Sequence, residues 1–210
     1  MALPVLVIGK SGSGKSASMR NFNKDELGIV NVLGKPLPFK NNFKTFKTDD
    51  YKQVKTALKG SKVDTLVIDD GGYLITNEFM RRSNEKGFQK FTDLGNNFFS
   101  LIRFIENEVS EDKIVYIMMH EDASELEVKP KTIGKLLDEK VCIEGMFTIV
   151  LRTMLKDGEH IFRTQSNGYD VAKSPMGMFE SEEIENDLKA VTETIREYYA
   201  VSVEEEKINE

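Results

Sequence analysis

The sequence of 210 residues has no tryptophan, two histidines and one cysteine. A disulfide needs two cysteines, so Cys142 cannot form one within the chain, in agreement with a reducing compartment. No apolar run approaches the roughly 20 residues of a membrane-spanning helix. The first residues, MALPVLVIGK, reach a glycine too early for a signal peptide. We therefore expect a cytoplasmic protein without membrane contact.

The sequence also lacks an excess of basic residues. Its 35 acidic residues outnumber 29 basic ones, which gives a net charge of −6. This balance argues against a nonspecific coat protein for nucleic acids, which is usually basic. A local basic channel is still compatible with it, because acidic residues gather after Glu180 while lysine and arginine cluster in the middle. The length suits one domain with its own core.

Short apolar runs alternate with segments of helical spacing along the chain. The runs, which are typical of buried strands, are Leu3–Ile8, Ile29–Leu33, Val63–Ile68 and Lys113–Met119. The segments with helical spacing are Asp50–Leu58, Asp93–Val109 and Ser181–Ala200. This alternation predicts an α/β fold in which helices flank a mixed, mostly parallel sheet.

The last third of the chain has a different pattern. Two apolar runs, Met146–Leu155 and His160–Thr164, flank a Lys-Asp-Gly-Glu turn and predict an antiparallel hairpin at one edge of the sheet. Ser181 is a candidate N-cap of the C-terminal helix, and we expect the acidic tail Val203–Glu210 to fray. The two expected parts of the chain are a core, residues 1–180, and a C-terminal helix with its acidic tail, residues 181–210.

The strongest motif is a glycine loop, Gly9–Ser16, which matches the P-loop pattern G-x-x-x-x-G-K-[ST] in full. It follows an apolar strand and precedes a predicted helix start at Ser16–Phe22. Its glycines let successive N–H groups point at phosphate oxygens. Lys15 would reach the β- and γ-phosphates of ATP, and the Ser16 hydroxyl would bind Mg²⁺. The alternative is a generic glycine–serine loop. The predicted nucleotide-binding residues are Gly9, Lys10, Ser11, Gly12, Ser13, Gly14, Lys15, Ser16 and Ala17.

Two acidic residues follow the strand Val63–Ile68. Asp69 is placed to hold the water shell of Mg²⁺, so Ser16 and Asp69 form the predicted metal site. Asp70 is either a group that polarises the attacking water or a turn residue before the next glycines. Paired with the glycine loop, an acidic residue at a strand end is a strong signal for a triphosphate site.

Both histidines lie near predicted strand ends. His120 closes the strand Lys113–Met119, where a polar residue can sense the γ-phosphate, and Glu121 could share that role. The predicted catalytic residues are Lys15, Asp69, Asp70 and His120. The alternative for His120 is a structural role, which is also the role we predict for His160 in the hairpin.

Two basic segments follow the predicted strands Val63–Ile68 and Lys113–Met119. The first basic segment contains Arg81, Arg82, Lys86 and Lys90, interleaved with Phe79, Phe88 and Phe91. The second basic segment contains Lys129, Lys131, Lys135 and Lys140. Cations interleaved with aromatic rings bind single-stranded DNA by charge and base stacking. The alternatives are a solvated helix face and an ordinary surface loop.

Two further cations, Arg163 and Lys173, lie in the last third of the chain. A cation there could complete the site of a neighbouring subunit in trans, as an arginine finger does. The alternative is that both are surface cations.

The sequence resembles the phage-encoded AAA-type ATP-binding proteins with a RecA-like P-loop core, some of which are associated with single-strand annealing recombination. The segments that carry the resemblance are Gly9–Ser16, Leu66–Asp70, Tyr116–His120, Thr164–Pro175, Gly34–Phe39 and Lys131–Lys135. The resemblance implies an ATPase of phage DNA replication or recombination in a bacterial host. It also implies a homo-oligomer, single-stranded DNA and a phage recombination or single-strand-binding protein as partners, and DNA-facing loops at residues 76–92 and 121–140.

The chain departs from RecA in lacking a glutamate on the predicted strand Ile29–Leu33. Asp49, Asp50 or Asp70 would have to act as the catalytic base instead. Two other functions stay open. One is a nucleoside or nucleotide kinase, with Arg81 and Arg82 in a lid. The other is a nucleotide-gated, noncatalytic adaptor that recruits a partner through the acidic C-terminal helix.

Overall fold

The computed structural model describes residues 1–208, with side chains for residues 1–200 except Asp138. Within that part of the chain the strands are β1 (Leu3–Gly9), β2 (Leu27–Asn31), β3 (Thr45–Lys47), β4 (Thr65–Asp69), β5 (Ile114–Ala123), β6 (Val128–Pro130), β7 (Ile149–Lys156), β8 (Glu159–Arg163) and β9 (Glu183–Glu185). The helices are α1 (Tyr51–Gly60), α2 (Tyr73–Arg81), α3 (Gln89–Glu108) and α4 (Leu188–Ile208). Three short helical segments are η1 (Ser16–Asn21), η2 (Leu136–Lys140) and η3 (Glu144–Met146).

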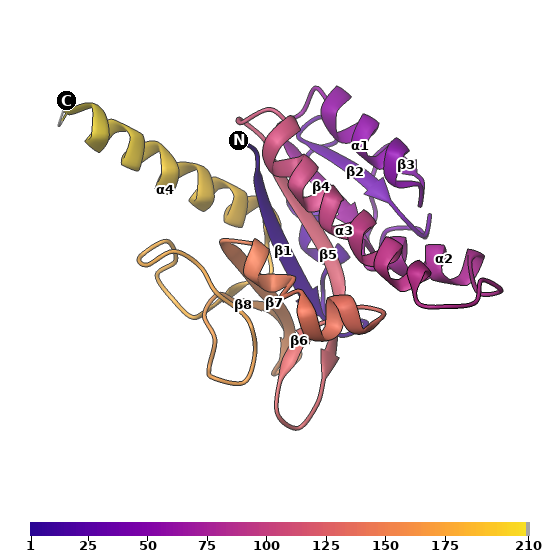
Figure 1. Ribbon diagram of the computed structural model, residues 1–210. Coiled ribbons are helices and arrows are strands. Elements are labelled where there is room, and N and C mark those ends of the chain that lie inside the picture. Colours follow the sequence, from indigo (N-terminus) through magenta and orange to yellow (C-terminus); the bar gives the residue numbers. More distant parts are fainter. Residues whose placement is uncertain (209–210) are drawn as a thin grey trace.

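The described strands form one sheet in the order β3-β2-β4-β5-β1-β7-β8-β9, and β6 pairs with β5 (Figure 1). Strands β3, β2, β4, β5, β1 and β7 pair in parallel, whereas β8, β9 and β6 join antiparallel. The predicted α/β fold with a mixed, mostly parallel sheet is therefore confirmed. The predicted hairpin is confirmed as β7 and β8, and β9 extends it.

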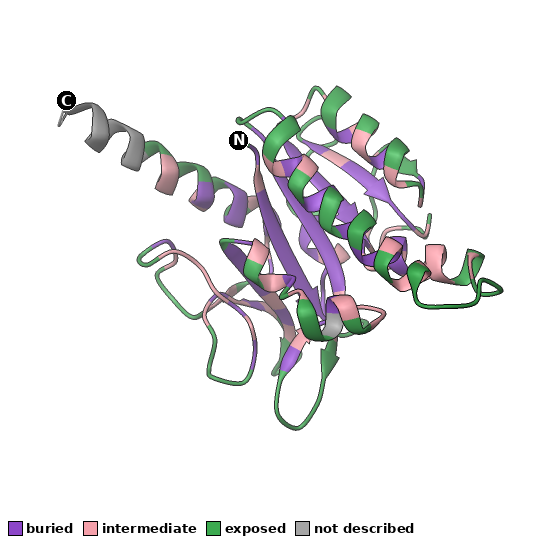
Figure 2. Cartoon of the chain, viewed as in Figure 1, coloured by how far each residue is buried: buried purple, intermediate pink, exposed green. Residues whose placement is uncertain are grey.

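Helices cover both faces of the sheet (Figure 1). On one face, Leu6 and Ile8 of β1 belong to a core that also contains residues of α1, α2 and α3, such as Phe98. On the other face, Val5 and Val7 belong to a second core that contains residues of η1 and α4. Since β1 is buried on both faces, its sequence is a continuous apolar run rather than an alternating one (Figure 2).

Of two predicted helix starts, one is confirmed in position and one is wrong. The predicted start at Ser16 is confirmed as the beginning of η1, a 3-10 helix that ends at Asn21. The C-terminal helix begins at Leu188 rather than Ser181, because Glu183–Glu185 pairs with β8 as strand β9.

The N-cap of α4 is Asp187 rather than Ser181. Its Oδ1 accepts hydrogen bonds from the backbone N–H groups of Lys189 (2.9 Å) and Ala190 (3.4 Å). Helix α4 continues to Ile208 and so includes most of the tail that we expected to fray, whereas Asn209 and Glu210 lie outside the described residues. None of the helices in residues 1–208 has the length and apolarity needed to cross a membrane.

Candidate functional site

The carboxyl ends of three neighbouring strands bring the predicted site together. Strand β5 lies between β1 and β4, and Gly9 of β1 is level with His120 of β5. Ile68 of β4 is level with Ile117 of β5, so Asp69 emerges at the same edge. The glycine loop and Asp69 therefore lie on either side of the strand that carries His120.

The glycine loop adopts a conformation that its residue types permit. Gly12 and Gly14 have φ angles of 78° and 108°, in the region that favours glycine. A side chain on Gly9 would overlap the hydroxyl of Thr153, which lies on β7 and contacts the Ser13 hydroxyl. The hairpin strand β7 is therefore part of the wall that shapes this loop.

Lys15 is folded back onto the loop that carries it. Its Nζ donates hydrogen bonds to the carbonyl oxygens of Gly9 (2.7 Å) and Lys10 (2.8 Å), and the residue is only 7% exposed. Burial lowers the pKa of Lys15 to about 8, although the nearby charges of Asp70 and Asp69 oppose that shift. The ammonium group is thus held in a site that penalises its charge.

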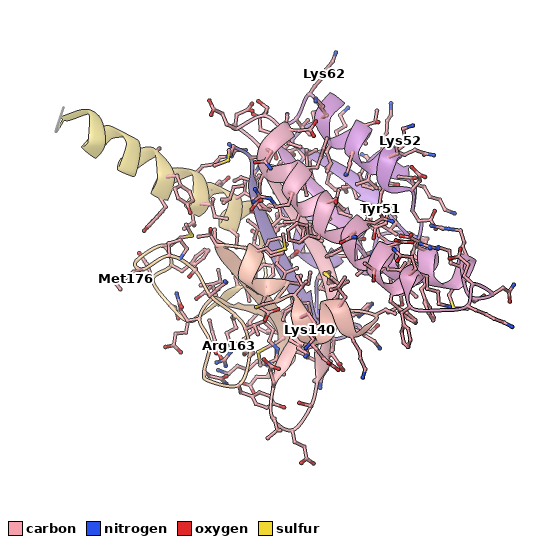
Figure 3. All side chains as sticks on the ribbon, viewed as in Figure 1. Tyr51, Lys52, Lys62, Lys140, Arg163 and Met176 are labelled. Atoms are coloured by element: carbon pink, nitrogen blue, oxygen red, sulfur yellow. The ribbon has the colours of Figure 1, made fainter. Side chains whose placement is uncertain are left out.

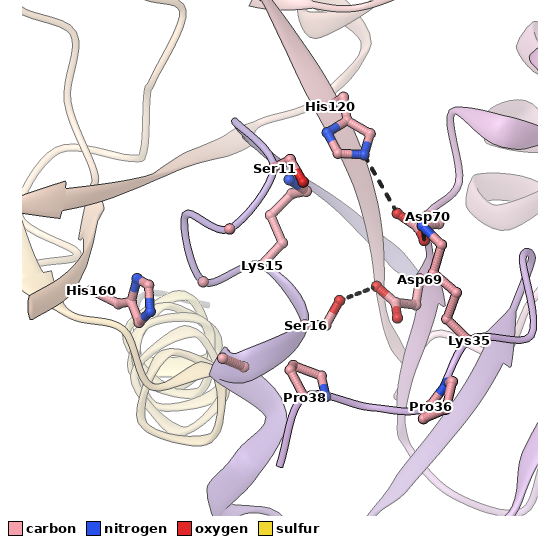
Figure 4. Close-up of a pocket in the computed structure, with 13 residues that line it drawn as sticks. Ser11, Lys15, Ser16, Lys35, Pro36, Pro38, Asp69, Asp70, His120 and His160 are labelled. Atoms are coloured by element: carbon pink, nitrogen blue, oxygen red, sulfur yellow. Dashed lines mark hydrogen bonds and ion pairs between the residues drawn. The ribbon is translucent and has the colours of Figure 1, made fainter.

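Ser16 and Asp69 are in direct contact. The Ser16 hydroxyl donates to Asp69 Oδ1 at 2.8 Å (Figure 4). Burial raises the pKa of Asp69 to about 6, and the bond from Ser16 opposes this rise. The two predicted metal-binding side chains therefore present their oxygen atoms side by side.

Asp70 connects His120 to a lysine that the sequence patterns did not single out. Asp70 Oδ1 lies 3.7 Å from His120 Nε2, and its Oδ2 lies 3.4 Å from Lys35 Nζ. Burial, followed by the charge of Lys15, lowers the pKa of His120, so the neutral imidazole is favoured. The ring of Tyr73 packs edge-on against His120, with ring centroids 5.9 Å apart. The φ angle of Asp70, directly after β4, is 58°, a left-handed conformation that is uncommon for residues other than glycine.

These groups surround a cavity of about 280 Å³, called the first cavity below (Figure 4). Its walls include Lys15, Ser16, Asp69, Asp70 and His120 from the predicted set. Of the predicted nucleotide-binding residues, Ser11, Gly12, Gly14 and Ala17 also line it. All four predicted catalytic residues therefore meet at one cavity.

Four residues of the first cavity, one of them Pro38, lay outside the predicted site. Lys35 and Pro36 come from the loop after β2, and His160, which we predicted to be structural, lies against Gly14. A weak signal existed for Lys35, since the segment Gly34–Phe39 contributed to the family resemblance. No pattern in the sequence marked His160, because its contact with Gly14 joins distant parts of the chain.

The alternative catalytic bases Asp49 and Asp50 lie elsewhere. Asp49 accepts hydrogen bonds from Asn77 (2.8 Å) and Arg81 (2.6 Å), and Asp50 caps α1 by accepting the N–H of Gln53. Neither residue lines the first cavity. Among the three alternatives, Asp70 is the one that does.

Glu121 and Arg163 belong to a network of largely buried ion pairs. The Glu121 side chain is 2% exposed and forms two bonds with Arg152, at 2.8 Å and 3.0 Å. Arg152 also contacts Asp170, and Arg163 pairs with Glu183 at 2.7 Å. Within this chain, Glu121 is thus committed to Arg152, and Arg163 is committed to its own sheet edge rather than presented outward.

Lys173 is the other proposed trans-acting cation, and its backbone forms hydrogen bonds with β7. Its N–H and C=O bond to Val150 of β7 at 2.9 Å and 2.8 Å. Lys173 is half-buried and does not line the first cavity.

The two arginines of the first basic segment pair with acidic side chains of the same chain. Arg81 contacts Asp49 at 2.6 Å. Arg82 contacts three carboxylates, which belong to Glu78, Glu85 and Asp93, at 3.2, 2.8 and 2.7 Å. Their charges are therefore largely compensated within the chain.

The aromatic residues of this segment differ in exposure, since Phe79 and Phe91 are half-buried and Phe88 is exposed. Phe79 and Phe91 contact each other with centroids 5.8 Å apart, and Lys90 lies 5.4 Å from each ring. Phe88 is 88% exposed, beside the exposed Lys86. Lys86 and Phe88 are therefore the members of the first basic segment that face solvent most openly.

The second basic segment lies next to the first. Lys129 belongs to β6, Lys135 precedes η2 and Lys140 ends it. A side chain on Gly134 would meet the Phe91 ring at 3.0 Å, so the two segments pack together. The backbone N–H of Lys131 donates to the His120 carbonyl at 2.8 Å, which joins this segment to the edge of the first cavity.

No cluster of three or more histidine, cysteine, aspartate or glutamate residues that could hold a metal ion occurs in the described part of the chain. No protein-family model matches the sequence, and no curated protein is significantly similar to it. Function must therefore be inferred from the geometry of the site itself.

Proposed function

We propose that this protein is a P-loop ATPase with a RecA-like core, which binds ATP with Mg²⁺ at the glycine loop. The observation that carries the proposal is the convergence of Lys15, the Ser16–Asp69 pair and His120 on the first cavity. A loop with glycines at positive φ, opening at the carboxyl edge of a parallel sheet, is the usual setting of a phosphate cradle.

The charges of the first cavity support a ligand that carries both phosphate and metal. Burial shifts the pKa values of Lys15 and Asp69 toward the neutral forms, so each charge lacks sufficient compensation. A triphosphate would favour the charged form of Lys15, and a divalent cation would favour the charged form of Asp69. To reach the phosphates, Lys15 would leave the carbonyl oxygens of Gly9 and Lys10.

The oxygen set suits Mg²⁺ in particular. Mg²⁺ commonly takes one or two protein oxygens and completes its octahedron with phosphate oxygens and water. Ser16 and Asp69 supply such a pair. The ion would neutralise charge that develops on the phosphates. In this proposal Asp70 orients the attacking water, and Lys35 and His120 hold the Asp70 carboxylate from its two sides.

We also propose that ATP turnover is coupled to single-stranded DNA. The support is positional, because the two basic segments pack together at Gly134 and Phe91, and the backbone N–H of Lys131 donates to the carbonyl of His120, which lines the first cavity. A change at His120 would therefore reach the second basic segment directly. Lys86 and Phe88 offer a charge and a stacking surface to a strand. Because Arg163 is already paired in the chain, a trans-acting role for it would require rearrangement on oligomerisation.

The test is an ATPase assay of the full chain with and without saturating single-stranded DNA, alongside its mass in the presence of ATP. We expect release of ADP and phosphate, a higher rate with DNA, and an oligomer. Equal hydrolysis rates with and without DNA would contradict the proposed coupling of ATP turnover to single-stranded DNA. ATP binding without any turnover would favour the noncatalytic adaptor.

A second candidate function is phosphoryl transfer to a small acceptor. It is favoured by another cavity that adjoins the first and shares Lys35 and His120 with it. A panel of nucleosides and nucleotides with labelled ATP separates the two functions. Label that appears in an acceptor indicates a kinase, and label that appears only in inorganic phosphate indicates hydrolysis.

A further inference from the structure

A second cavity, of about 480 Å³, adjoins the first on the side of α2. We propose that it binds a phosphate group of a second ligand, next to the nucleotide. The inference rests on the proposed function, which places a nucleotide in the first cavity. It adds a separate binding site with its own residues and its own chemistry.

The two cavities meet at shared residues. Ser11, Lys35 and His120 line both of them, whereas Lys15 and Asp69 line only the first. The second cavity is therefore reached past the start of the glycine loop rather than through its centre. A ligand held there would lie directly beside whatever occupies the first cavity.

The walls of the second cavity carry an excess of positive charge. Its cations are Lys10, Lys35 and Lys131, and its acidic group is Glu121. The charge of Glu121 is compensated by the two bonds from Arg152. Lys35 is paired with Asp70 at 3.4 Å, whereas Lys10 and Lys131 have no carboxylate partner among the described residues, so the wall keeps an excess of positive charge that favours an anion.

Two lysines of the second cavity, Lys10 and Lys131, differ from the other basic residues in their lack of carboxylate partners among the described residues. Arg81, Arg82 and Arg163 are all bound to carboxylates. Among the described residues, Lys10 and Lys131 form no ion pair. Lysines that converge on a cavity without acidic partners are available to a ligand.

Neutral donors and a helix end complete the site. Gly72, Tyr73 and Thr76 line the second cavity at the first turn of α2, which contains no acidic residue. The positive end of a helix dipole and the hydroxyl groups of Tyr73 and Thr76 both suit phosphate oxygens. Together with the lysines, they make phosphate a better match than a carboxylate or an apolar group.

The same chemistry has two sources, a phosphodiester of a DNA strand and the phosphate of a small molecule. The experiment separates them by titrating the full chain, saturated with a nonhydrolysable ATP analogue and Mg²⁺. Three probes are used: a fluorescein-labelled oligothymidylate, thymidine monophosphate and inorganic phosphate. Binding of the oligonucleotide alone identifies a strand, and binding of the small probes identifies a small-molecule site.

The decisive variant is Lys131→Gln, which removes one wall charge on an exposed residue. We expect its affinity for the bound probe to fall about tenfold, the scale of one charge-assisted hydrogen bond. Lys62→Gln is the matched control, because Lys62 is an exposed lysine at the far end of the molecule (Figure 3). Equal affinities of the parent chain and both variants would overturn the inference.

A second readout uses the absence of tryptophan from the chain. Ile133→Trp places the only indole in the wall of the second cavity without removing a proposed donor, and Phe46→Trp places it on the exposed strand β3. A saturable change in emission for Ile133→Trp alone supports the inference, and the absence of any change contradicts it. Binding of the ATP analogue is measured on the same samples. If the analogue binds and the probes do not, only this inference fails; if the analogue does not bind, the proposed function fails.

Discussion

The glycine loop and the first basic segment are both rich in cations, but their electrostatic situations are opposite. Lys15 is buried, bonds only to carbonyl oxygens of its own loop, and has a pKa lowered to about 8. Arg82 lies near the surface and contacts three carboxylates, whose hydrogen bonds raise its pKa. Lys15 bonds to no carboxylate of the described residues, so a ligand could supply its counter-charge. Arg82 already contacts three carboxylates.

This contrast shows that the number of basic residues is a poor guide to a binding site. What matters is whether the fold has already compensated their charges. By that measure, the first cavity and the residues Lys10 and Lys131 of the second cavity are candidates for binding ligands. Arg82 instead links the end of α2 to Asp93 of α3, and Arg81 links α2 to Asp49.

The largest effect is expected for Lys15→Ala. Loss of a buried cation with charge-assisted bonds should weaken binding of a Mg²⁺-bound ATP analogue about 100-fold, at roughly 1.5–3 kcal/mol per bond. Isothermal titration calorimetry measures the change. Lys62→Ala serves as the control and should bind like the parent chain. A loss below threefold for Lys15→Ala would contradict the proposed role of the loop.

The pH dependence of stability should differ between the two regions. Burial raises the pKa of Asp69 to about 6, whereas an unfolded aspartate titrates near pH 3.9. Between these values the folded chain holds a proton that the unfolded chain releases. The free energy of unfolding contributed by Asp69 therefore falls as pH rises, by about 2 kcal/mol across roughly pH 4 to 6. Denaturant titrations of the parent chain and Asp69→Asn should differ by this slope.

Asp93 provides the matched comparison in the first basic segment. The hydrogen bond from Arg82 lowers the pKa of Asp93, so its stabilising contribution is present above about pH 4 and is lost as the pH falls further. Asp93→Asn should therefore remove stability near neutral pH, with the opposite dependence on pH. The same sign of slope for both variants would show that the two regions do not differ as described.

A smaller loss of stability is expected for Gly14→Ala. Its φ of 108° strains any side chain, and the new Cβ would meet the His160 ring at 2.9 Å. Gly12→Ala is the control, because its φ of 78° gives similar strain but no atom lies within 4 Å of a new Cβ. We expect losses of about 2 kcal/mol and about 1 kcal/mol in the free energy of unfolding. Equal losses would indicate that His160 does not press on the loop.

The smallest effect on ligand binding is expected for Arg82→Gln. Because Arg82 is bound to carboxylates of its own chain, affinity for the ATP analogue should change less than twofold. The melting temperature should fall slightly, since α2 and α3 lose a shared ion-pair cluster. A large loss of nucleotide affinity would place Arg82 in the site and weaken the contrast between the two regions.

The central strands were predictable because they are buried on both faces. Such strands are continuous apolar runs, as in β1, β4 and β5. The edge strands β3 and β9 were not predicted, since each has three residues and little burial. Helix α2 was also missed, because its nine residues follow a tight turn and have no side-chain cap.

The site was predictable where chemistry and strand ends coincide. Asp69 and His120 meet the glycine loop because parallel strands end at one edge. Lys35 and His160 could not be predicted from periodicity, because their contacts with Asp70 and Gly14 join distant segments. The ion pairs of Arg81 with Asp49 and of Arg82 with Asp93 could not be predicted for the same reason, because they join α2 and its C-cap to distant segments of the chain.

The central position of β1 has a consequence for how the chain folds. Its register pairs Leu3 with Ile114 on one side and Val5 with Ile149 on the other. During synthesis the glycine loop is made long before β7, so β1 gains its second neighbour only after Ile149 has been made. Pairings between such distant residues are slow to form, and an open strand edge invites association with other chains. Strand β1 therefore waits for β7 to complete its pairing, and a nascent chain that ends before β7 lacks the Thr153 hydroxyl that contacts Ser13 of the glycine loop.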